Sequence, residues 1–314
     1  MFKILLDEPS MQYKRGQFVS GKLVIKVDRE VKCKNITLIL KGQADVQFIY
    51  GNEDDKYTYS YFKEFFNFQA HLVGDGETET SISPDEEYTF DFAFQLPSQA
   101  LPASFKGSYG KVKYVLEGKV KRSFWERDFN ILQPITILGE LDQEHVSEAK
   151  LPSEVKMSKT FGFCCCTSGP LFLHVRVPIR GCVPGETIYF NVEVNNMSRK
   201  RIVDLSAKIL QTVDFTGKHE GSEETMNTYA CFNELRRGEG VSPGDSETWR
   251  DVLVVPSVPP TKLGAGCEFI DVQYFILVRA HVADLMARSP KALCPIVIGT
   301  SRQELESNRR QYMN

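Results

Sequence analysis

A stretch of alternating apolar and polar residues from Gly169 to Phe215 constrains the fold of this chain more than any other feature. It holds three alternating runs, separated by Pro184-Gly185 and by residues 195–198. A period of two predicts strands with one buried face, and the breaks predict turns. The result is an antiparallel meander whose apolar face needs a second sheet to cover it. The positions expected on that face are Leu171, Leu173, Val175, Val177, Ile188, Phe190, Val192, Val194, Val203, Leu205, Ala207, Ile209, Val213 and Phe215.

The first half of the chain repeats this pattern in the same order. Residues 23–27 and 36–48 alternate on either side of a predicted turn at 28–34. Further segments correspond in order: 96–107 with 255–264, 112–116 with 272–276, and 132–137 with 293–298. Tyr114 thereby corresponds to Tyr274. Several correspondences in the same order predict two copies of one fold. Each copy is too long to be a solenoid repeat.

The chain is therefore predicted to be all-β, with two antiparallel, immunoglobulin-like β-sandwich domains in tandem. Its 314 residues suit about two domains, and its 42% hydrophobic content suffices for a core in each. The polar segment 140–159 lacks alternation and marks the boundary. The predicted division is a first sandwich at 1–141, a linker and entry strand at 142–166, a second sandwich at 167–300 and a short charged tail at 301–314.

The remaining segments carry weaker signals. The polar stretches 51–61 and 216–228 are expected to be long solvent-facing connections at matching places in the two halves. Almost no helical period is found before residue 300, and the charged tail is expected to be a short surface helix or frayed. The strongest strand of the first half runs from Tyr88 to Leu96, so Phe92 is expected in the core and Asp91 at the surface.

Charge and composition exclude several classes of protein. A net charge of −3 is unlike that of nucleic-acid-binding proteins, which are normally basic, so no nucleic-acid partner is expected. No apolar run approaches the roughly 20 residues of a membrane span, and residues 2–6 are too short a run for a signal peptide. The eight cysteines lack the spacing of a disulfide framework, which indicates free thiols in a reducing cytosol. We expect a cytoplasmic protein without a transmembrane segment.

Motifs of catalysis and cofactor binding are absent from the sequence. It contains no G-x-S-x-G, no phosphate-binding glycine loop and no H-E-x-x-H, and its five histidines are widely spread. His174 falls on the polar side of its strand and is expected at the surface. The consecutive Cys164, Cys165 and Cys166 cannot all ligate one zinc in a strand, because neighbours point to opposite faces. They are interpreted as small buried hydrophobes, with a metal site and S-acylation as alternatives. No catalytic, metal-binding or cofactor-binding residue is predicted.

One basic cluster, Arg199, Lys200 and Arg201, lies on a predicted turn of the second meander. It is the candidate contact for an anionic lipid headgroup or phosphorylated cargo, where each charge near an anionic surface contributes on the order of 1 kcal/mol. The alternative is a solvated turn whose charges oppose aggregation. The same two interpretations apply to Lys119, Lys121 and Arg122.

The order of these segments resembles the arrestin family, and within it the α-arrestins, or arrestin domain-containing proteins. The resemblance covers about residues 2–300, and it is carried by segments 96–107, 112–114, 164–170, 247–249 and 295–300. It implies two arrestin-like sandwiches joined by a short linker. It also implies a non-enzymatic cytosolic adaptor that links membrane cargo, often receptors or transporters, to ubiquitin ligases, endocytic sorting and protein transport, with peripheral contact at the plasma membrane or endosomes.

Departures from the family pattern limit what this resemblance implies. The sequence has no Pro-Pro-x-Tyr, since Pro259-Pro260 is followed by Thr261 and Lys262, so a ubiquitin ligase is expected only indirectly or through a longer arrestin relative. Residues 135–138 contain no arginine for a phosphate-sensitive charge cluster. Ser246 stands where the thioredoxin-binding branch has a cysteine. The alternative function is a trafficking-coat subunit of the same fold, as in retromer, and an enzyme ranks third.

Overall fold

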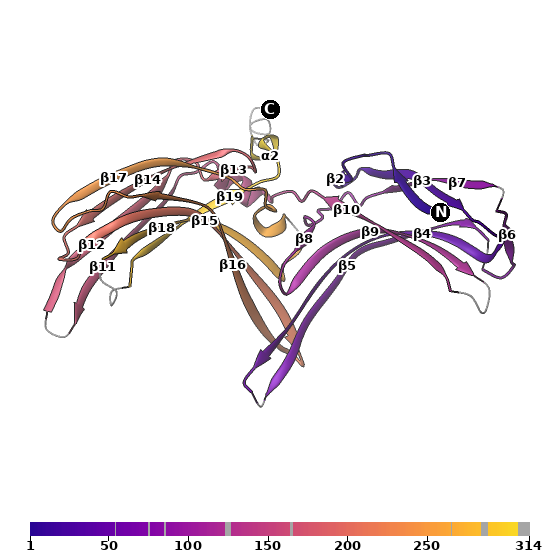
Figure 1. The fold of residues 1–314 in the computed structure, drawn as a ribbon, viewed down its shortest axis with the longest axis horizontal. Helices are drawn as coiled ribbons and strands as arrows, with labels where there is room; N and C mark the ends of the chain where they lie inside the picture. Colours follow the sequence, from indigo (N-terminus) through magenta and orange to yellow (C-terminus); the bar gives the residue numbers. More distant parts are fainter. Residues whose placement is uncertain are drawn as a thin grey trace. The chain divides into compact units, whose positions relative to one another are not determined.

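The computed structural model describes residues 1–53, 55–74, 76–84, 86–122, 127–163, 166–264, 266–283 and 288–306 (Figure 1). The described chain is mostly β-strand and divides into two compact units. Unit 1 comprises Met1–Gly139, Phe215–Met226 and Gly264–Phe269, and unit 2 comprises Glu140–Asp214, Asn227–Leu263 and Ile270–Asn314. The two short segments of unit 1 are therefore contributed by the second half of the chain.

Unit 1 is built on two sheets. The smaller sheet is antiparallel, in the order β1-β3-β7. The larger sheet has the order β5-β4-β9-β10-β2, with β6 on β4 and β8 on β9. The strands are β1 (Phe2–Leu6), β2 (Gln12–Tyr13), β3 (Phe18–Lys26), β4 (Val31–Gly51), β5 (Lys56–Val73), β6 (Thr80–Ile82), β7 (Glu87–Gln95), β8 (Phe105–Lys106), β9 (Gly110–Arg122) and β10 (Phe129–Ile137). Leu23, Leu38 and Leu116, one from each of three strands, are fully buried in the core.

Unit 2 is also a pair of sheets. The first is antiparallel, in the order β11-β12-β14-β17, and the second follows β13-β19-β18-β15, with β16 beside β15. The joined ends of β15 and β16, residues 215–226, belong to unit 1. The strands are β11 (Ser153–Phe163), β12 (Cys166–Val177), β13 (Gly181–Cys182), β14 (Thr187–Asn196), β15 (Ile202–His219), β16 (Ser222–Arg237), β17 (Ser246–Val254), β18 (Ile270–Val282) and β19 (Lys291–Ile298). A 3-10 turn, η1, covers Thr261–Leu263. The prediction of two β-sandwiches in tandem is confirmed.

The predicted apolar face of the second meander is buried with one exception. Thirteen of the fourteen predicted positions are buried, and Val203 is 42% exposed. The pairing of β15 with β18 shifts register between Ile202 and Asp204, so that Ile202 is buried in place of Val203. A β-bulge inserts one residue and reverses the side to which earlier residues point.

The two predicted solvent-facing connections are wrong. Residues 51–61 include most of a hairpin turn and the start of β5, which pairs with β4 from Lys56 onward. Residues 216–228 hold the ends of β15 and β16, which turn at Glu220 and Gly221 with positive φ angles of 45° and 85°. Most side chains of these hairpin ends are exposed, so the alternation that marks a buried strand is missing from the sequence.

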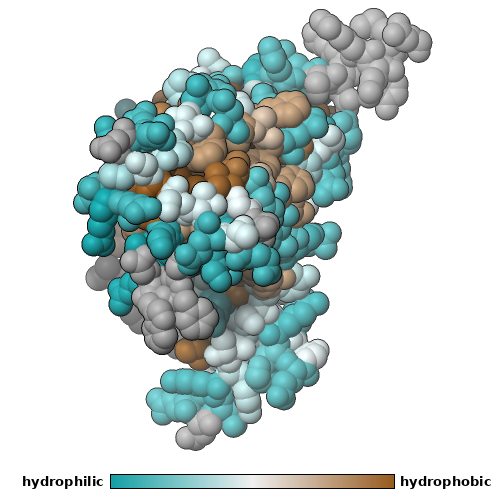
Figure 2. All heavy atoms as spheres, turned by 90° about the vertical axis from the view of Figure 1, so that its right-hand side faces the viewer, coloured by the Kyte–Doolittle hydropathy of each residue, from teal (hydrophilic) through white to brown (hydrophobic). Residues whose placement is uncertain are grey.

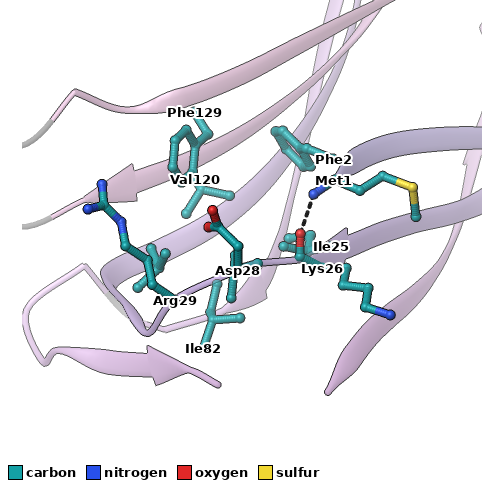
Figure 3. Close-up of a pocket in the computed structure, with 11 residues that line it drawn as sticks. Met1, Phe2, Ile25, Lys26, Asp28, Arg29, Ile82, Val120 and Phe129 are labelled. Atoms are coloured by element: carbon teal, nitrogen blue, oxygen red, sulfur yellow. Dashed lines mark hydrogen bonds between the residues drawn. The ribbon is translucent and has the colours of Figure 1, made fainter. Parts of the chain in front are cut away.

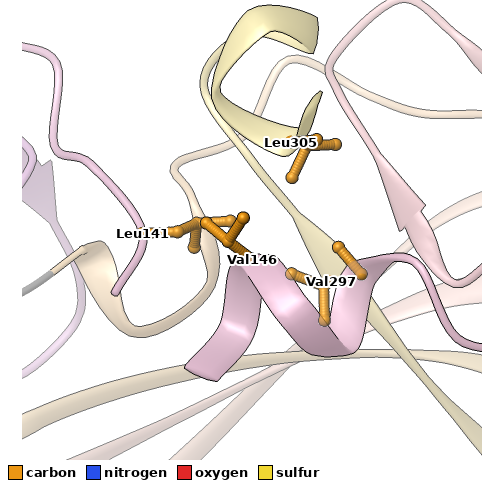
Figure 4. Close-up of a cluster of buried hydrophobic side chains, with 5 residues drawn as sticks. Leu141, Val146, Val297 and Leu305 are labelled. Carbon is orange, nitrogen blue, oxygen red and sulfur yellow. The ribbon is translucent and has the colours of Figure 1, made fainter. Parts of the chain in front are cut away.

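The predicted linker contains a helix, α1 (Gln143–Ala149), which has no periodic signal in the sequence. Asp142 caps it, with the carboxylate accepting the backbone N–H of His145 at 2.9 Å. Seven residues are too few for a stable isolated helix, so tertiary burial is needed. Figure 4 shows Val146 of α1 beside Leu141, near Val297 of β19 and Leu305 of the short helix α2 (Arg302–Glu306). The tail thus begins as a helix, and residues 307–314 lie outside the described residues.

A buried tyrosine occupies the corresponding place in each unit. Tyr114 of β9 and Tyr274 of β18 are each 1% exposed. Tyr114 donates its hydroxyl hydrogen to the carbonyl oxygen of Pro102 at 2.7 Å, and Tyr274 donates to that of Pro259 at 2.7 Å. Burial raises the pKa of both phenols well above the usual range, so both remain donors. Each hydrogen bond ties a core strand to the proline-containing loop that precedes it.

The ring of Tyr114 also explains a glycine in the middle of a strand. Gly42 of β4 lies opposite Tyr114 in the sheet. A Cβ added at Gly42 would lie 2.6 Å from a carbon of the tyrosine ring. The glycine therefore provides the space in which the ring lies.

Phe92→Ala is expected to lower the free energy of unfolding by about 3–5 kcal/mol, because Phe92 is 8% exposed and its ring packs near that of Phe94. Asp91→Asn is the matched control. The Asp91 side chain is 83% exposed and its ion pair with Lys22 spans 3.6 Å, so its loss should change stability little. Urea denaturation followed by circular dichroism measures both. Equal denaturation midpoints of the two variants would contradict the assignment of Phe92 to the buried face of β7.

Tyr114→Phe and Tyr274→Phe should each cost about 1–3 kcal/mol, since each leaves a proline carbonyl, that of buried Pro102 or of half-buried Pro259, without its donor. Tyr274→Phe should cost more, because the hydroxyl also accepts from Gln211 Nε2 at 2.8 Å. Tyr189→Phe, at a 66% exposed residue, is the control and should stay within about 0.5 kcal/mol of the parent. Unchanged stability in both buried variants would show that these hydrogen bonds contribute nothing.

Candidate interaction surfaces

The basic cluster lies on the loop 197–201, between β14 and β15, and a buried asparagine fixes the backbone of this loop. Asn196 is 0% exposed. Its Nδ2 donates to the carbonyl oxygens of Lys200 at 2.8 Å, Val241 at 3.1 Å and Ser242 at 3.2 Å. Its Oδ1 accepts from the hydroxyl of Ser198 at 2.6 Å. Both ends of one amide are thus used to hold the loop in a single conformation.

The charged side chains of this loop differ in their surroundings. Arg199 and Arg201 are exposed, and Lys200 is half-buried. Within the described part of the chain, neither Arg199 nor Arg201 forms a salt bridge. The carbonyl oxygen of Arg201 accepts the backbone N–H of Ala283 at 3.1 Å, which joins the loop to the end of β18. The loop therefore presents two guanidinium groups to solvent from a fixed backbone.

Of the three basic residues considered on β9, Lys119 and Arg122 have partners within unit 1, whereas Lys121 is exposed. Lys119 Nζ lies 3.3 Å from a carboxylate oxygen of Asp128. The guanidinium of Arg122 lies over the ring of Phe129, 4.7 Å from its centroid. These charges stabilise the β9–β10 hairpin and leave less free charge for a ligand than the loop 197–201 does.

An apolar hollow of about 470 Å³ opens between the two sheets of unit 1. Its walls include Ile25, Ile82 and Val120, and Lys26 and Arg29 lie at its edge. In Figure 3, Phe2 and Phe129 lie opposite Ile82, with Asp28 between them. Figure 2, which faces this side of the molecule, shows apolar surface among hydrophilic residues. The hollow can accept an apolar side chain, but its edge carries charges of both signs.

The sequence did not reveal this hollow, because its lining comes from six separate strands, including β4 through Val31, and the turn after β3. Phe2 belongs to β1, Ile25 to β3, Ile82 to β6, Val120 to β9 and Phe129 to β10. Each of these residues fits an ordinary apolar strand position. Only the pairing of the strands brings them together.

His174 lies on the outer face of β12, as predicted, between two carboxylates of neighbouring strands. Its Nε2 lies 2.9 Å from Oε1 of Glu154, and its Nδ1 lies 3.2 Å from Oε2 of Glu193. A hydrogen bond from Lys156 is the main cause that lowers the pKa of Glu154. No cluster of His, Cys, Asp and Glu suited to a metal ion occurs in the described residues. The group is a cross-strand ionic network on the sheet surface.

The cysteines that the structure describes with their side chains are free thiols. Cys33, Cys182, Cys267 and Cys294 are buried, and Cys231 is exposed. Burial raises the pKa of the Cys182 thiol to about 12, whereas a reactive cysteine needs a lowered pKa. Burial also raises the pKa of Cys33 and Cys294. Cys164, Cys165 and the side chain of Cys166 lie outside the described residues, so the three interpretations of the triplet stay open.

None of the helices in the described residues has the length and apolar character needed to cross a membrane.

Each half of the chain matches a known protein domain. Residues 2–144 match the family model "Arrestin (or S-antigen), N-terminal domain", and residues 167–303 match "Arrestin (or S-antigen), C-terminal domain". The chain belongs to the arrestin family, in its α-arrestin branch. The predicted family is therefore confirmed.

Similar proteins include members of this branch from several animals. Arrestin domain-containing protein 17 of Caenorhabditis elegans is 28% identical over 96% of this chain and 71% of its own length. Arrestin domain-containing protein 1 of Homo sapiens is 23% identical over 95% of this chain and 64% of its own length. Thioredoxin-interacting protein of Sus scrofa is 24% identical over 98% of this chain and 75% of its own length. The chain thus spans about two thirds to three quarters of these relatives.

Asn196→Ala is expected to lower the free energy of unfolding by at least about 2 kcal/mol, because the buried carbonyl of Val241 and the partly buried carbonyls of Lys200 and Ser242 lose their donor. Asn195→Ala is the matched control, since Asn195 is the preceding residue and is exposed. Its effect should stay within about 0.5 kcal/mol. Limited proteolysis at Arg199 and Arg201 provides a second measurement and should accelerate only in Asn196→Ala. Equal proteolysis rates in the two variants would contradict the role assigned to Asn196.

Maleimide labelling of the native protein should modify Cys231 and leave Cys33, Cys182, Cys267 and Cys294 unmodified, because among these five described thiols Cys231 alone is exposed. After denaturation without reductant, all eight cysteines should become reactive. Mass spectrometry of tryptic peptides assigns each modification. Labelling of the four buried thiols at the rate of Cys231, or a disulfide isolated under rapid alkylation, would contradict this expectation.

Proposed function

We propose that this protein is a non-enzymatic adaptor of the α-arrestin type. It binds membrane cargo proteins, receptors or transporters, through its sandwiches and links them to endocytic sorting, protein transport and ubiquitin-dependent regulation. The observation that supports this is the presence of both arrestin domain types, in order, over residues 2–144 and 167–303. The division into sandwiches at 1–141 and 167–300 is part of the proposal. So is action at the cytoplasmic face of the plasma membrane or of endosomes.

The loop 197–201 is the proposed contact of this adaptor with anionic groups on the membrane or on phosphorylated cargo. Arg199 and Arg201 are exposed and without salt bridges among the described residues, and Lys200 lies between them. A backbone fixed by Asn196 lowers the entropy that is lost when an anion binds. Arginine is suited to phosphate because its guanidinium can donate two parallel hydrogen bonds.

The connection to a ubiquitin ligase is proposed to be indirect. The printed sequence contains no Pro-Pro-x-Tyr, the motif that WW domains recognise in their ligands. A ligase would then reach the cargo through another protein, such as a longer arrestin relative. Pairing with such a relative would add avidity, because tethering two weak sites strengthens binding by roughly 10²–10⁴-fold.

Proximity labelling in living cells tests the adaptor proposal. The full chain is fused to a biotin ligase, and the control is the same ligase without the chain. Receptors and transporters of the plasma membrane or endosomes should be enriched. Purification of the chain in a stable stoichiometric complex would instead indicate a coat subunit, and absence of membrane proteins from the labelled set would contradict the adaptor function.

A pull-down with an isolated WW-domain array from a HECT-type ligase tests the indirect route. The array should retain a relative that carries Pro-Pro-x-Tyr and should not retain this chain. Retention of both proteins to the same extent would show a ligase site on the sandwich surface and would contradict the indirect route.

Vesicle co-sedimentation tests the loop, with vesicles of phosphatidylcholine, phosphatidylserine and phosphatidylinositol 4,5-bisphosphate. Arg199→Gln combined with Arg201→Gln should reduce the bound fraction several-fold, since each removes a charge worth on the order of 1 kcal/mol. The charge-matched control is Lys3→Gln with Lys32→Gln, two exposed lysines of unit 1. Equal losses in the two double variants would indicate an effect of net charge alone.

A further inference from the structure

The outer face of the β11-β12-β14-β17 sheet in unit 2 carries a hollow of about 570 Å³. Arg176 of β12, Tyr189 and Asn191 of β14, and Arg250 and Val252 of β17 contribute to its lining. These residues alternate with the buried positions of the same strands, so they lie on the side of the sheet away from the core.

The strand register places the two arginines in one row. Arg176 lies opposite Asn191, and Asn191 lies opposite Arg250. Neighbouring strands are about 4.8 Å apart, so the two arginine backbones lie roughly 10 Å apart across β14. The next row pairs Tyr189 with Val252. The face thus combines two guanidinium groups with an aromatic ring that is 66% exposed.

The two arginines have no carboxylate partner among the described residues, and the carboxylates nearby are engaged elsewhere. Glu154 faces Arg176 in the register, but its carboxylate contacts Lys156 at 2.8 Å and His174 at 2.9 Å. Asp251 accepts the indole N–H of Trp249 at 3.1 Å and the backbone N–H of Val252 at 2.9 Å. Asp251 also lines the hollow, so the positive charge available to a ligand there comes from Arg176 and Arg250 alone.

Asn191 adds an unused polar atom between the arginines. Its Nδ2 donates to Glu193 at 3.2 Å, whereas its buried Oδ1 has no hydrogen-bond partner. Because this oxygen is buried, a backbone N–H of an extended peptide can reach it only if the Asn191 side chain turns toward the ligand. Arginine and tyrosine are also the residues that contribute most to binding at protein interfaces.

We propose that this hollow binds an acidic peptide segment of a partner protein. Two acidic side chains two or three residues apart bind Arg176 and Arg250, since an extended chain advances about 3.3 Å per residue. An apolar side chain of the same segment packs on Tyr189 and Val252. This inference deepens the proposed adaptor function, on which it rests, by giving the chemistry of one partner.

A peptide fits this face better than a membrane does. Here two arginines are bordered by Glu154, Glu193 and Asp251, whose charges would be repelled by an anionic lipid surface. A peptide can direct its acidic groups to the two arginines alone.

Selection from a random 16-residue peptide library displayed on phage tests the proposal with the full chain as bait. Peptides with two acidic residues two or three apart and an apolar neighbour should be enriched. The affinity of the best synthetic peptide is then measured by fluorescence anisotropy. Arg176→Gln combined with Arg250→Gln should weaken binding at least about tenfold, because two charge-assisted hydrogen-bonding groups are lost. Tyr189→Ala should weaken it further.

The matched control is Arg288→Gln with Lys291→Gln, two exposed residues of the same unit, which should change affinity less than about twofold. Unchanged melting temperatures show that the variants are folded. Enrichment of no acidic pair, or equal weakening by both double variants, would overturn the proposal. A membrane role would appear as reduced binding of Arg176→Gln with Arg250→Gln to phosphatidylserine vesicles, with peptide binding intact, and would also overturn it. These outcomes concern peptide binding to the hollow and would not change the set of cargo proteins identified by proximity labelling. Failure of this proposal is therefore distinguishable from failure of the adaptor function.

Discussion

Each half of this protein depends on covering the apolar face of an antiparallel meander. A sheet that is apolar on one side and polar on the other is stable only when a second layer removes the apolar side from water. In unit 2, Leu173, Val192 and Leu253 from three paired strands are all within 1% of full burial. The outward neighbours of these three residues include His174, Asn191 and Val252.

The sequence predicts this layer arrangement well, because burial leaves a period of two along each strand. Prediction from the sequence fails where residues are paired in a sheet but are not buried. The ends of the β4–β5 and β15–β16 hairpins are paired but exposed, so their sequences resemble loops. Val203 is displaced by a bulge that leaves no trace in composition. Helix α1 depends on contacts with Val297 and Leu305, about 150 residues away, which local propensity cannot report.

The interaction surfaces were predictable to different degrees. The cluster Arg199 to Arg201 is contiguous in sequence and was found on its predicted turn, but its support by Asn196 depends on carbonyl groups some 45 residues away. The row formed by Arg176, Asn191 and Arg250 comes from three strands and exists only through their register. A lone arginine at an outward position is unremarkable in sequence. Two of them beside one unsatisfied amide oxygen are a binding surface.

The packing of α1 on α2 gives unit 2 a region that is less stable than its core. The cluster holds Leu141, Val146, Ala149, Val297 and Leu305, and only Val297 belongs to a sheet. Because α1 is too short to persist alone, its amide hydrogens are protected by these tertiary contacts and by Arg180, whose Nε donates to the carbonyl oxygen of Glu148 at 2.8 Å. Displacement of α2 removes Leu305 from the cluster, so we expect it to speed hydrogen exchange in α1. A molecule that binds in place of α2 would thereby loosen the segment through which the chain enters unit 2.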